Sequence, residues 1–247
     1  MTVSPYGLMI AAGILTAGAA GWFLTRRFAL DFNDFLLLAT YTVVFGVIGA
    51  KGAYLLLNAG RIDWSRLTDP AFFNALMMGG FIFYGGVPTG LFGLWLAGKL
   101  HKIEVKPYLR MGVPLLPLCH AFGRVGCYLA GCCFGIPYDG PLAVTYERSY
   151  GAPLGVPLFP VQLLEAVLVL AIAGTLFALC LRGWGEWSLL GLYMGLYGTA
   201  RFCLEYLRYD AERGQLGWFS TSQWVSLVLV AVALAGVLWS RIKLKRA

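Results

Sequence analysis

Three residues of an otherwise apolar stretch, HAFGRVGCYLAGCCFG, have side chains that could do chemistry. His120, Arg124 and Cys127 follow one another at intervals of four and three residues, so on a helix they share one face. An arginine in apolar surroundings binds phosphate with its planar fork or pairs with a carboxylate. We expect Arg124 to bind a ligand, although it could also reach Glu165 or Glu205 on another helix. His120 is kept neutral by Arg124 and can accept a proton near neutral pH, so it is a candidate base.

A second polar stripe runs through YGTARFCLEYLR. Tyr197, Arg201, Glu205 and Arg208 follow the same helical spacing. Glu205 comes one turn after Arg201, so a structural ion pair between them is the alternative to phosphate binding by Arg201. An ionisable group at the centre of a bilayer costs about 2.5–3.5 kcal/mol. Both stripes, together with Lys51 and Glu165, are therefore expected to face a polar cavity between helices.

The cysteines of the opening stretch have the spacing C-x4-C-C. Cys127, Cys132 and Cys133 do not follow a standard zinc pattern, and adjacent cysteines rarely bind one ion together. We expect these thiols to pack or to line the pocket, with a disulfide as the alternative. We expect neither a metal nor a cofactor.

The elements that position these residues are expected to be membrane-spanning helices. The sequence is 59% hydrophobic and 13% charged over 247 residues, whereas soluble domains are about a quarter charged. The apolar residues fall in blocks of the length that spans a bilayer. The third and fourth blocks are long and interrupted by Gly and Pro, so one of them could be a broken or re-entrant helix. The seven expected spans cover about residues 6–25, 35–57, 71–98, 112–134, 160–181, 187–207 and 218–240.

The basic residues predict the orientation. No Lys or Arg precedes the first span, whereas Arg26 and Arg27 follow it, which is the reverse of a signal peptide. With the N-terminus outside, eleven Lys and Arg fall in inner segments and five in outer loops, as the positive-inside rule requires. We therefore expect an integral membrane protein with an outer N-terminus and a cytoplasmic C-terminus. Nucleic acid is not expected as a partner, since no soluble basic domain is present.

The expected fold is all-α, a single polytopic domain over residues 1–247 with seven transmembrane helices around a polar cavity. The longest outer segment, residues 135–159, is rich in Gly and Pro. We expect this segment to cover the mouth of the cavity as a flap or a short strand.

Six ordered motifs extend over nearly the whole chain: YGLM, GAKGAYLL, FYGGVPTG, GRVGCYLAGCCFG, FPVQLLEA and YGTARFCLEYLR. With them, the sequence resembles the bacterial prolipoprotein diacylglyceryl transferases of the inner membrane. The resemblance implies transfer of the diacylglyceryl group of phosphatidylglycerol to the thiol of a lipobox cysteine. The acceptor would be a prolipoprotein that its signal peptide still holds at the outer leaflet, and glycerol phosphate would leave.

The resemblance also assigns roles to residues. Arg124 and Arg201 would stabilise the leaving phosphate, with His120 and Tyr84 as the other catalytic candidates. The expected substrate-binding residues are Tyr6, Lys51, Gly85, Gly86, Cys127, Gln162, Glu165, Tyr197, Glu205 and Arg208. Among them, Tyr6 and Tyr197 would bind the head group, and the two glutamates would orient the arginines.

Several positions depart from the family pattern. Tyr84 replaces the histidine of a His-Gly-Gly segment, and Lys51 replaces an arginine. In the signature motif, Cys127, Ala130 and Cys132 replace two asparagines and a glutamate. Either His120 takes over as the base, or the chain is a divergent paralogue that uses the same donor with a different acceptor. A seven-span transporter or receptor is the non-enzymatic alternative, although the two halves show no similarity to each other.

Overall fold

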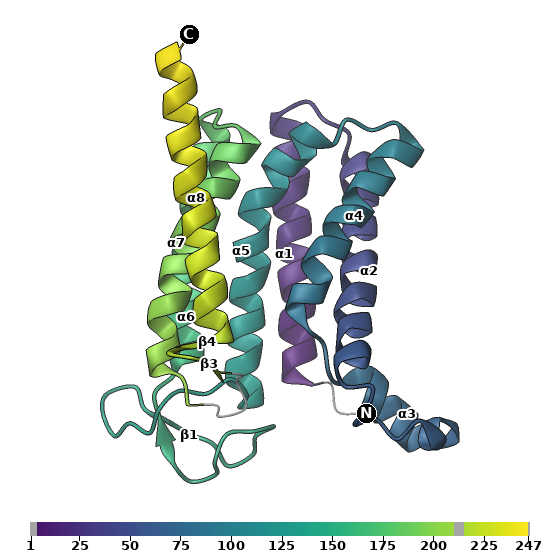
Figure 1. Ribbon diagram of the computed structural model, residues 1–247, viewed down its shortest axis with the longest axis vertical. Helices are drawn as coiled ribbons and strands as arrows, with labels where there is room; N and C mark the ends of the chain where they lie inside the picture. Colours follow the sequence, from purple (N-terminus) through teal and green to yellow (C-terminus); the bar gives the residue numbers. More distant parts are fainter. Residues whose placement is uncertain (1–3, 210–214, 247) are drawn as a thin grey trace. The chain divides into compact units, whose positions relative to one another are not determined.

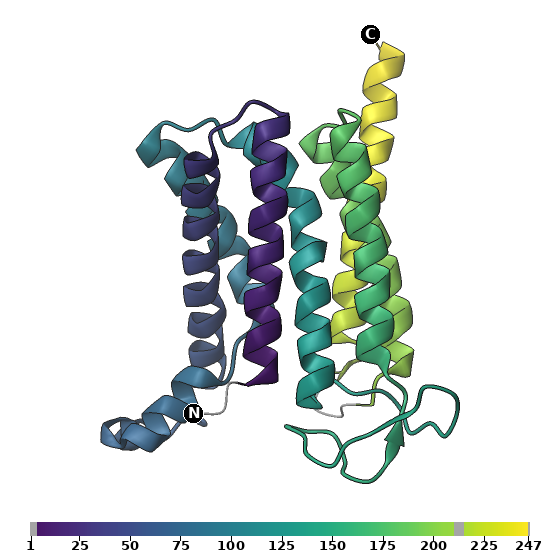
Figure 2. The same cartoon turned by 180° about the vertical axis from the view of Figure 1, so that it is seen from behind.

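The computed structural model describes residues 4–209 and 215–246, which form helices joined by loops and two short strand pairs (Figures 1 and 2). Two compact units can be distinguished. Unit 1 contains Met1–Leu24 and Leu109–Ala247, and unit 2 contains Thr25–Tyr108. Each unit is described by itself below.

Unit 1 is built from long helices. They are α1 (Pro5–Arg27), α5 (Val105–Ala130), α6 (Val161–Leu181), α7 (Glu186–Leu204), the 3-10 turn η2 (Glu205–Leu207) and α8 (Thr221–Arg246). The last residues of α1, from Thr25, and the first residues of α5, up to Tyr108, belong to unit 2. Helix α7 packs against both α6 and α8. Pro114 and Pro117 lie inside α5, yet the helix continues through both of them. It ends at Ala130, and Gly131 follows with φ +65°, a left-handed conformation that suits glycine.

The segment between α5 and α6 folds over one end of unit 1. Strand β1 (Val144–Thr145) pairs with β2 (Pro157–Leu158) in antiparallel register. Tyr146, Ala152 and Leu158 form a small buried cluster there. Tyr146 Oη donates a hydrogen bond to Tyr128 O at the end of α5 (2.9 Å). Burial, and then the neighbouring Tyr128, raise the pKa of Tyr146 to about 12, so this hydroxyl keeps its proton at neutral pH. Whether the segment covers a cavity mouth stays a prediction.

A second short strand pair precedes α8. Strand β3 (Gln215–Leu216) pairs with β4 (Phe219–Ser220) in antiparallel register. Ser220 and Gln223 then cap the start of α8, since the Ser220 amide donates to Gln223 Oε1 and the Gln223 amide donates to Ser220 Oγ. The strand pair therefore fixes the point at which the chain enters its last helix.

Unit 2 contains two long helices, a short helix and a 3-10 turn. They are α2 (Phe32–Leu57), the 3-10 turn η1 (Trp64–Thr68), α3 (Pro70–Met78) and α4 (Phe83–His101). Asp69 caps α3 by accepting a hydrogen bond from the Ala71 amide (3.0 Å). Hydrogen bonding from that amide, and then from Arg66, lowers the pKa of Asp69, so its negative charge is maintained at the helix N-terminus.

Helices α2 and α4 pack closely along their glycines. A Cβ at Gly85 would lie 2.3 Å from Ala53 Cβ and 2.7 Å from Gly49 O. One at Gly86 would lie 2.8 Å from Gly46 O. The absence of side chains at these positions therefore permits backbone contact between the two helices.

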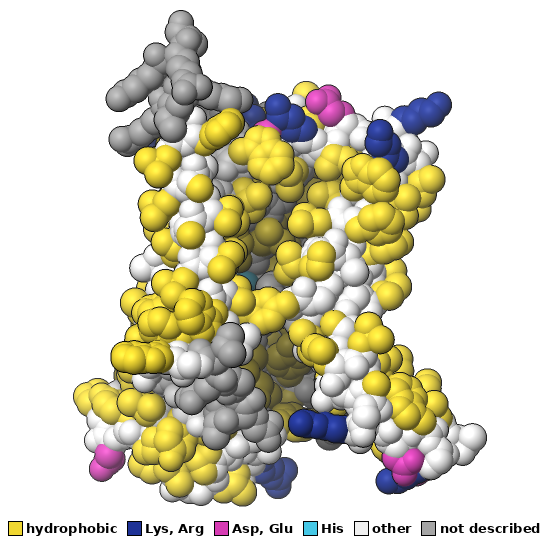
Figure 3. Space-filling view, in the orientation of Figure 1, with side chains coloured by type: hydrophobic (Ala, Val, Ile, Leu, Met, Phe, Trp, Pro, Cys, Tyr) yellow, Lys and Arg dark blue, Asp and Glu magenta, His cyan; other side chains and the backbone are white. Residues whose placement is uncertain are grey.

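The all-α polytopic fold is confirmed. Five helices of the described residues are long and apolar enough to cross a membrane: α1, α2, α5, α6 and Thr221–Trp239 of α8. Hydrophobic side chains cover the visible helix surfaces (Figure 3), as contact with lipid requires. The expected span 71–98 is divided into α3 and α4 by a break at residues 79–82. The fourth expected span, 112–134, is one continuous helix only as far as Ala130, after which the chain reverses at Gly131. The count of seven spans stays a prediction.

Candidate functional site

Glu165 is the centre of a buried polar cluster in unit 1. It lies in the second turn of α6 with no exposed surface. Its Oε1 lies 3.1 Å from Arg124 Nε and 3.6 Å from His120 Nε2, both on α5. Its Oε2 lies 3.6 Å from Arg208 Nη1, beyond α7. Tyr197 Oη on α7 donates to Glu165 Oε1 (3.3 Å). One carboxylate thus gathers residues of both predicted stripes.

Arg124 and His120 contact each other directly. Arg124 Nε donates a hydrogen bond to His120 Nε2 (3.1 Å). His120 Nε2 accepts this bond with a lone pair, which fits a neutral imidazole. Its ring also meets Tyr197 edge-on, with the ring centroids 5.2 Å apart. The predicted contact between His120 and Arg124 is present in the structure, and the neutral state of the imidazole stays a prediction.

The terminal nitrogens of Arg124 are not used in these contacts. Within residues 4–209 and 215–246, neither Nη1 nor Nη2 makes a hydrogen bond, and 17% of the side chain is exposed. A guanidinium that is held through Nε keeps its two terminal groups for a bidentate ligand. Ion pairing with Glu165, the alternative stated for Arg124, is observed, and it does not occupy the fork of the guanidinium.

Arg201 and Glu205 form an ion pair of their own. Arg201 Nη2 lies 2.7 Å from Glu205 Oε2, which is the structural pairing that the sequence left open. Two serines extend this ion pair into a hydrogen-bond network: Ser220 just before α8 and Ser222 in its first turn. Arg201 Nη2 donates to Ser222 Oγ (3.1 Å), and Ser220 Oγ donates to Glu205 Oε1 (2.7 Å). Arg201 Nη1 is buried and has no hydrogen-bond partner among the described residues.

The second stripe does not stay on one helix. Helix α7 ends at Leu204, η2 follows, and Arg208 has an extended backbone that bridges to Gly135. Tyr197 and Arg208 consequently reach Glu165, whereas Arg201 pairs with Glu205. The expectation of a single polar face is wrong in this respect, because the chain leaves the α-helix before the last residue of the stripe. Ser220 and Ser222 were missed by the sequence reasoning, and their signal was the polar FSTSQ segment just before an apolar span.

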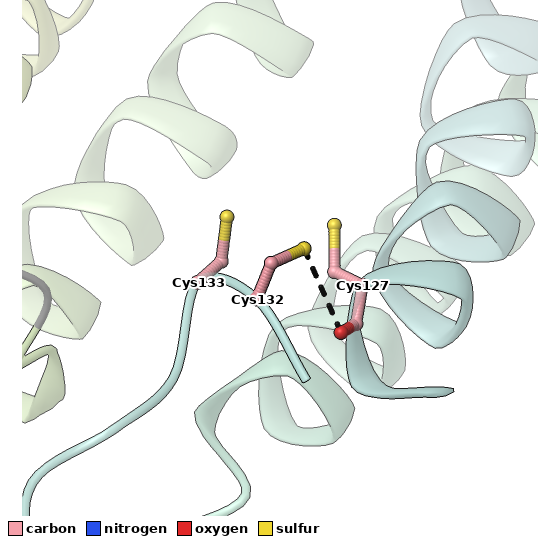
Figure 4. A group of neighbouring side chains, drawn as sticks. All are labelled: Cys127, Cys132 and Cys133. Atoms are coloured by element: carbon pink, nitrogen blue, oxygen red, sulfur yellow. Dashed lines mark hydrogen bonds between the residues drawn. The ribbon is translucent and has the colours of Figure 1, made fainter. Parts of the chain in front are cut away.

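Tyr6, Gln162 and Cys127 also lie in unit 1. A Cβ at Gly126 would come 3.0 Å from Tyr6 Cδ2, so this glycine allows the ring of Tyr6 to lie against α5. Gln162 is buried and donates through Nε2 to Cys132 O (2.8 Å). The sulfurs of Cys127, Cys132 and Cys133 lie within 4.8 Å of one another (Figure 4). The spacing C-x4-C-C gave no sign of this convergence, because it depends on the reversal of the chain at Gly131.

The remaining predicted residues belong to unit 2. Lys51 is buried on α2, and its Nζ donates to Gly79 O (2.6 Å) and to Leu76 O at the end of α3. It also lies over the rings of Tyr54 and Phe81. Gly85 and Gly86 are explained by helix packing, as described above. Tyr84 is 46% exposed on the first turn of α4. Substrate contacts of these four residues stay predictions.

Comparison with known proteins identifies the family. The family model described as prolipoprotein diacylglyceryl transferase matches residues 1–239. A Clostridium perfringens protein named phosphatidylglycerol–prolipoprotein diacylglyceryl transferase 2 is 32% identical over 233 residues, or 93% of this chain and 88% of that protein. Similarly named proteins of Clostridium tetani (30% identical, covering 93% and 90%) and Dehalococcoides mccartyi (29% identical, covering 100% and 93%) also match. The chain belongs to the prolipoprotein diacylglyceryl transferase family of multi-pass enzymes of the bacterial inner membrane.

Proposed function

We propose that this protein transfers the diacylglyceryl group of phosphatidylglycerol to the lipobox cysteine of prolipoproteins. Family membership supports the reaction. The observation that carries the proposal is the cluster around Glu165, which holds Arg124 and His120 together while the terminal nitrogens of Arg124 make no hydrogen bond among the described residues. Such an arrangement suits a reaction in which a phosphate leaves and a thiol loses its proton.

Arg124 stabilises the leaving group in this proposal. A thiolate attacks an sp³ glycerol carbon, and negative charge develops on the phosphate oxygens as the carbon–oxygen bond breaks. A guanidinium that Glu165 already holds nearby needs little reorganisation at that moment. Arg201 contributes through its buried Nη1, which has no hydrogen-bond partner among the described residues. Glu165 and Glu205 act as positioning residues, because each holds an arginine by its other nitrogens.

His120 is the proposed base. Its Nε2 lone pair accepts from Arg124 Nε in the structure. When a phosphate draws the guanidinium toward itself, that lone pair becomes available for the proton of the acceptor thiol. Tyr197 already donates to Glu165, so its proposed role is to position that carboxylate as well as to bind the head group. Tyr6 and Tyr84 stay proposed hydrogen-bond donors to the lipid, and Lys51, Gly85 and Gly86 stay proposed contacts.

We also propose that the N-terminus and the end of unit 1 with the segment 131–160 face outward. The start of α1, the end of α5 and the start of α6 lie at that end (Figures 1 and 2). Arg182 follows α6 at the other end, where the basic C-terminal helix also finishes. Positive charge collects on the cytoplasmic side of membranes, so this distribution supports a site that opens toward the outer leaflet.

A second candidate function differs in the acceptor. Tyr84, Cys127 and Cys132 replace family residues of the signature segments. These replacements favour, as a second candidate, a transferase with the same phospholipid donor and another acceptor.

Expression in bacteria depleted of their own transferase tests both candidates. Rescue with lipidated prolipoprotein, detected by the mass of the N-terminal peptide, is the expected result. Arg124→Ala should abolish rescue, and Arg148→Ala in the outer segment serves as the control. Absence of rescue together with turnover of phosphatidylglycerol by the purified protein would favour the other acceptor. Absence of both would overturn the proposed function.

A further inference from the structure

Three thiols converge where α5 ends, and no step of the proposed reaction assigns them a role. Cys127 lies on the last turns of α5, and Cys132 and Cys133 follow the reversal of the chain at Gly131. Their sulfur atoms all lie within 4.8 Å of one another (Figure 4). Cys132 Sγ points toward Cys127 and donates to Cys127 O (3.7 Å).

The backbone around these thiols is firmly held. The Cys132 amide donates to Cys127 O (3.1 Å), and Gln162 Nε2 donates to Cys132 O (2.8 Å). Cys133 has φ +56°, a left-handed conformation that is uncommon for residues other than glycine. Such a conformation persists only where surrounding contacts maintain it. The backbone that carries Cys132 and Cys133 next to Cys127 is therefore built into the fold.

Adjacent cysteines rarely bind one ion together, but here the chain reverses at Gly131, and all three sulfurs are free and within 4.8 Å of one another, close enough to share one metal ion. Zinc binds thiolates at about 2.3 Å, which places tetrahedral ligands roughly 3.8 Å apart. A disulfide needs about 2.05 Å, and it would leave one of the three thiols over. Within residues 4–209 and 215–246, no fourth His, Cys, Asp or Glu joins the group. Three protein ligands with one open position are typical of catalytic zinc, whereas structural zinc has four.

Nearby charges favour an anionic complex. The positive charges of Arg208 and Arg124 act on Cys133, and Arg124 also acts on Cys127. Zinc with three thiolates carries one negative charge, and a fourth thiolate would add another. The same guanidinium groups offset that charge in apolar surroundings.

We propose that Cys127, Cys132 and Cys133 bind one Zn²⁺ whose open position takes the thiol of the acceptor. The inference rests on the proposed function, since it needs a thiol as acceptor. A zinc site would also explain why Cys127 and Cys132 stand at signature positions of the family. Zinc would activate the acceptor thiol in place of the family residues that these cysteines replace.

The step balances without any change of oxidation state. The acceptor thiol would lose its proton as its sulfur binds Zn²⁺, and water would carry the proton to His120, which lies two turns, about 10 Å, along α5 from Cys127. The sulfur electron pair then attacks the glycerol carbon, so a carbon–sulfur bond forms. The carbon–oxygen bond to phosphate breaks, and its electron pair leaves with glycerol phosphate beside Arg124. The thioether product is neutral, binds zinc weakly, and is replaced by the next acceptor thiol.

Metal binding is tested on the full-length protein in detergent. After reduction and removal of metal by a chelator, Co²⁺ titration should give thiolate charge-transfer absorption that saturates at one ion per chain and that Zn²⁺ displaces. Cys127→Ser, Cys132→Ser and Cys133→Ser should each weaken binding by more than about 100-fold, since loss of an outer-shell partner alone costs roughly 10–100-fold. Cys203→Ser, outside the cluster, is the matched control and should bind as the parent protein does. Absence of the absorption, or its persistence in all three cluster variants, would overturn the proposal.

The acceptor position is tested with two peptides. A lipobox peptide with Cys should change the Co²⁺ spectrum, whereas the same peptide with Ser should not.

The rate of diacylglyceryl transfer should fall at least tenfold when the parent protein is treated with a chelator, and it should recover when Zn²⁺ is added. This test does not depend on variants that fold poorly. Transfer that is unaffected by chelation would overturn the zinc site while the proposed function stands. Metal binding without transfer to any peptide would instead contradict the proposed function. A disulfide between two of the three cysteines in alkylated protein from membranes would also count against the zinc site.

Discussion

Two buried charges, one in each unit, are stabilised in different ways. Glu165 in unit 1 is surrounded by side chains: Arg124, His120, Tyr197 and Arg208. Lys51 in unit 2 donates to backbone carbonyls at the end of α3 and lies over aromatic rings. A side-chain partner of Glu165 can turn toward a substrate, whereas the carbonyls at the end of α3 would be left without a donor if Lys51 turned away. The difference separates a charge that can serve a reaction from one that holds the fold.

The largest effect is expected at Glu165. Glu165→Gln keeps the shape of the side chain but removes its charge, so Arg124 and Arg208 lose their shared counter-ion. Breaking a buried ion pair by removing one partner costs about 3–5 kcal/mol. We expect a marked fall in the midpoint of thermal or guanidinium unfolding in detergent, followed by tryptophan fluorescence, together with loss of transfer. Glu147→Gln in the exposed outer segment is the control, and an equal stability of the two variants would contradict the central role of Glu165.

The next effect is expected on catalysis rather than on stability. Arg124→Lys keeps the positive charge near Glu165 but removes the planar fork and the hydrogen bond from Nε to His120. Loss of a preorganised donor to developing charge costs roughly 10²–10³ in kcat. Transfer to a lipobox peptide measures this change. A lysine variant with nearly full activity would show that charge alone is sufficient at this position.

Lys51→Met tests the other half of the comparison. The substitution leaves the carbonyls of Leu76 and Gly79 without their ammonium donor, and an unsatisfied buried polar group costs about 1–3 kcal/mol. We expect a lower unfolding midpoint, and a smaller loss of transfer rate than Arg124→Lys causes. If Lys51→Met instead reduced the transfer rate more than it reduced stability, Lys51 would belong with the substrate-binding residues of the resemblance.

The sequence predicted the helices better than their contacts. The expected span 160–181 corresponds closely to α6, and 6–25 to α1, because twenty apolar residues leave few alternatives in a bilayer. Spacing along one helix also placed His120 beside Arg124. The meeting of Glu165 with Arg124 depends on how α5 and α6 pack, which periodicity does not specify. The capping of α3 by Lys51 could not be predicted for the same reason, since it joins residues 25 and 28 positions apart.

Gly85→Ala should weaken unit 2 by a different mechanism. The added Cβ would lie 2.3 Å from Ala53 Cβ and 2.7 Å from Gly49 O, so α2 and α4 would have to move apart. Overpacking of this kind costs about 1–3 kcal/mol. Gly52→Ala on α2 is the matched control, because no atom lies within 4 Å of its added Cβ. Unfolding in detergent compares Gly85→Ala with Gly52→Ala. Equal unfolding midpoints would show that α2 and α4 can move apart at little cost in stability.

Tyr146→Phe should have the smallest effect, because it changes one hydrogen bond of the outer segment and no charge. The hydroxyl of Tyr146 donates to Tyr128 O, and its loss should cost about 0.5–1.5 kcal/mol. The buried ring remains, so the cluster with Ala152 and Leu158 should persist. Limited proteolysis of the segment measures the change locally. We expect cleavage to become several-fold faster while the midpoint of global unfolding hardly changes.

Tyr150→Phe, at an exposed position of the same segment, is the control. If the transfer rate fell in Tyr146→Phe as much as in Arg124→Lys, the outer segment would have to belong to the active site. The difference between residues that serve the reaction and residues that stabilise the fold would then apply to this segment as well as to the helices.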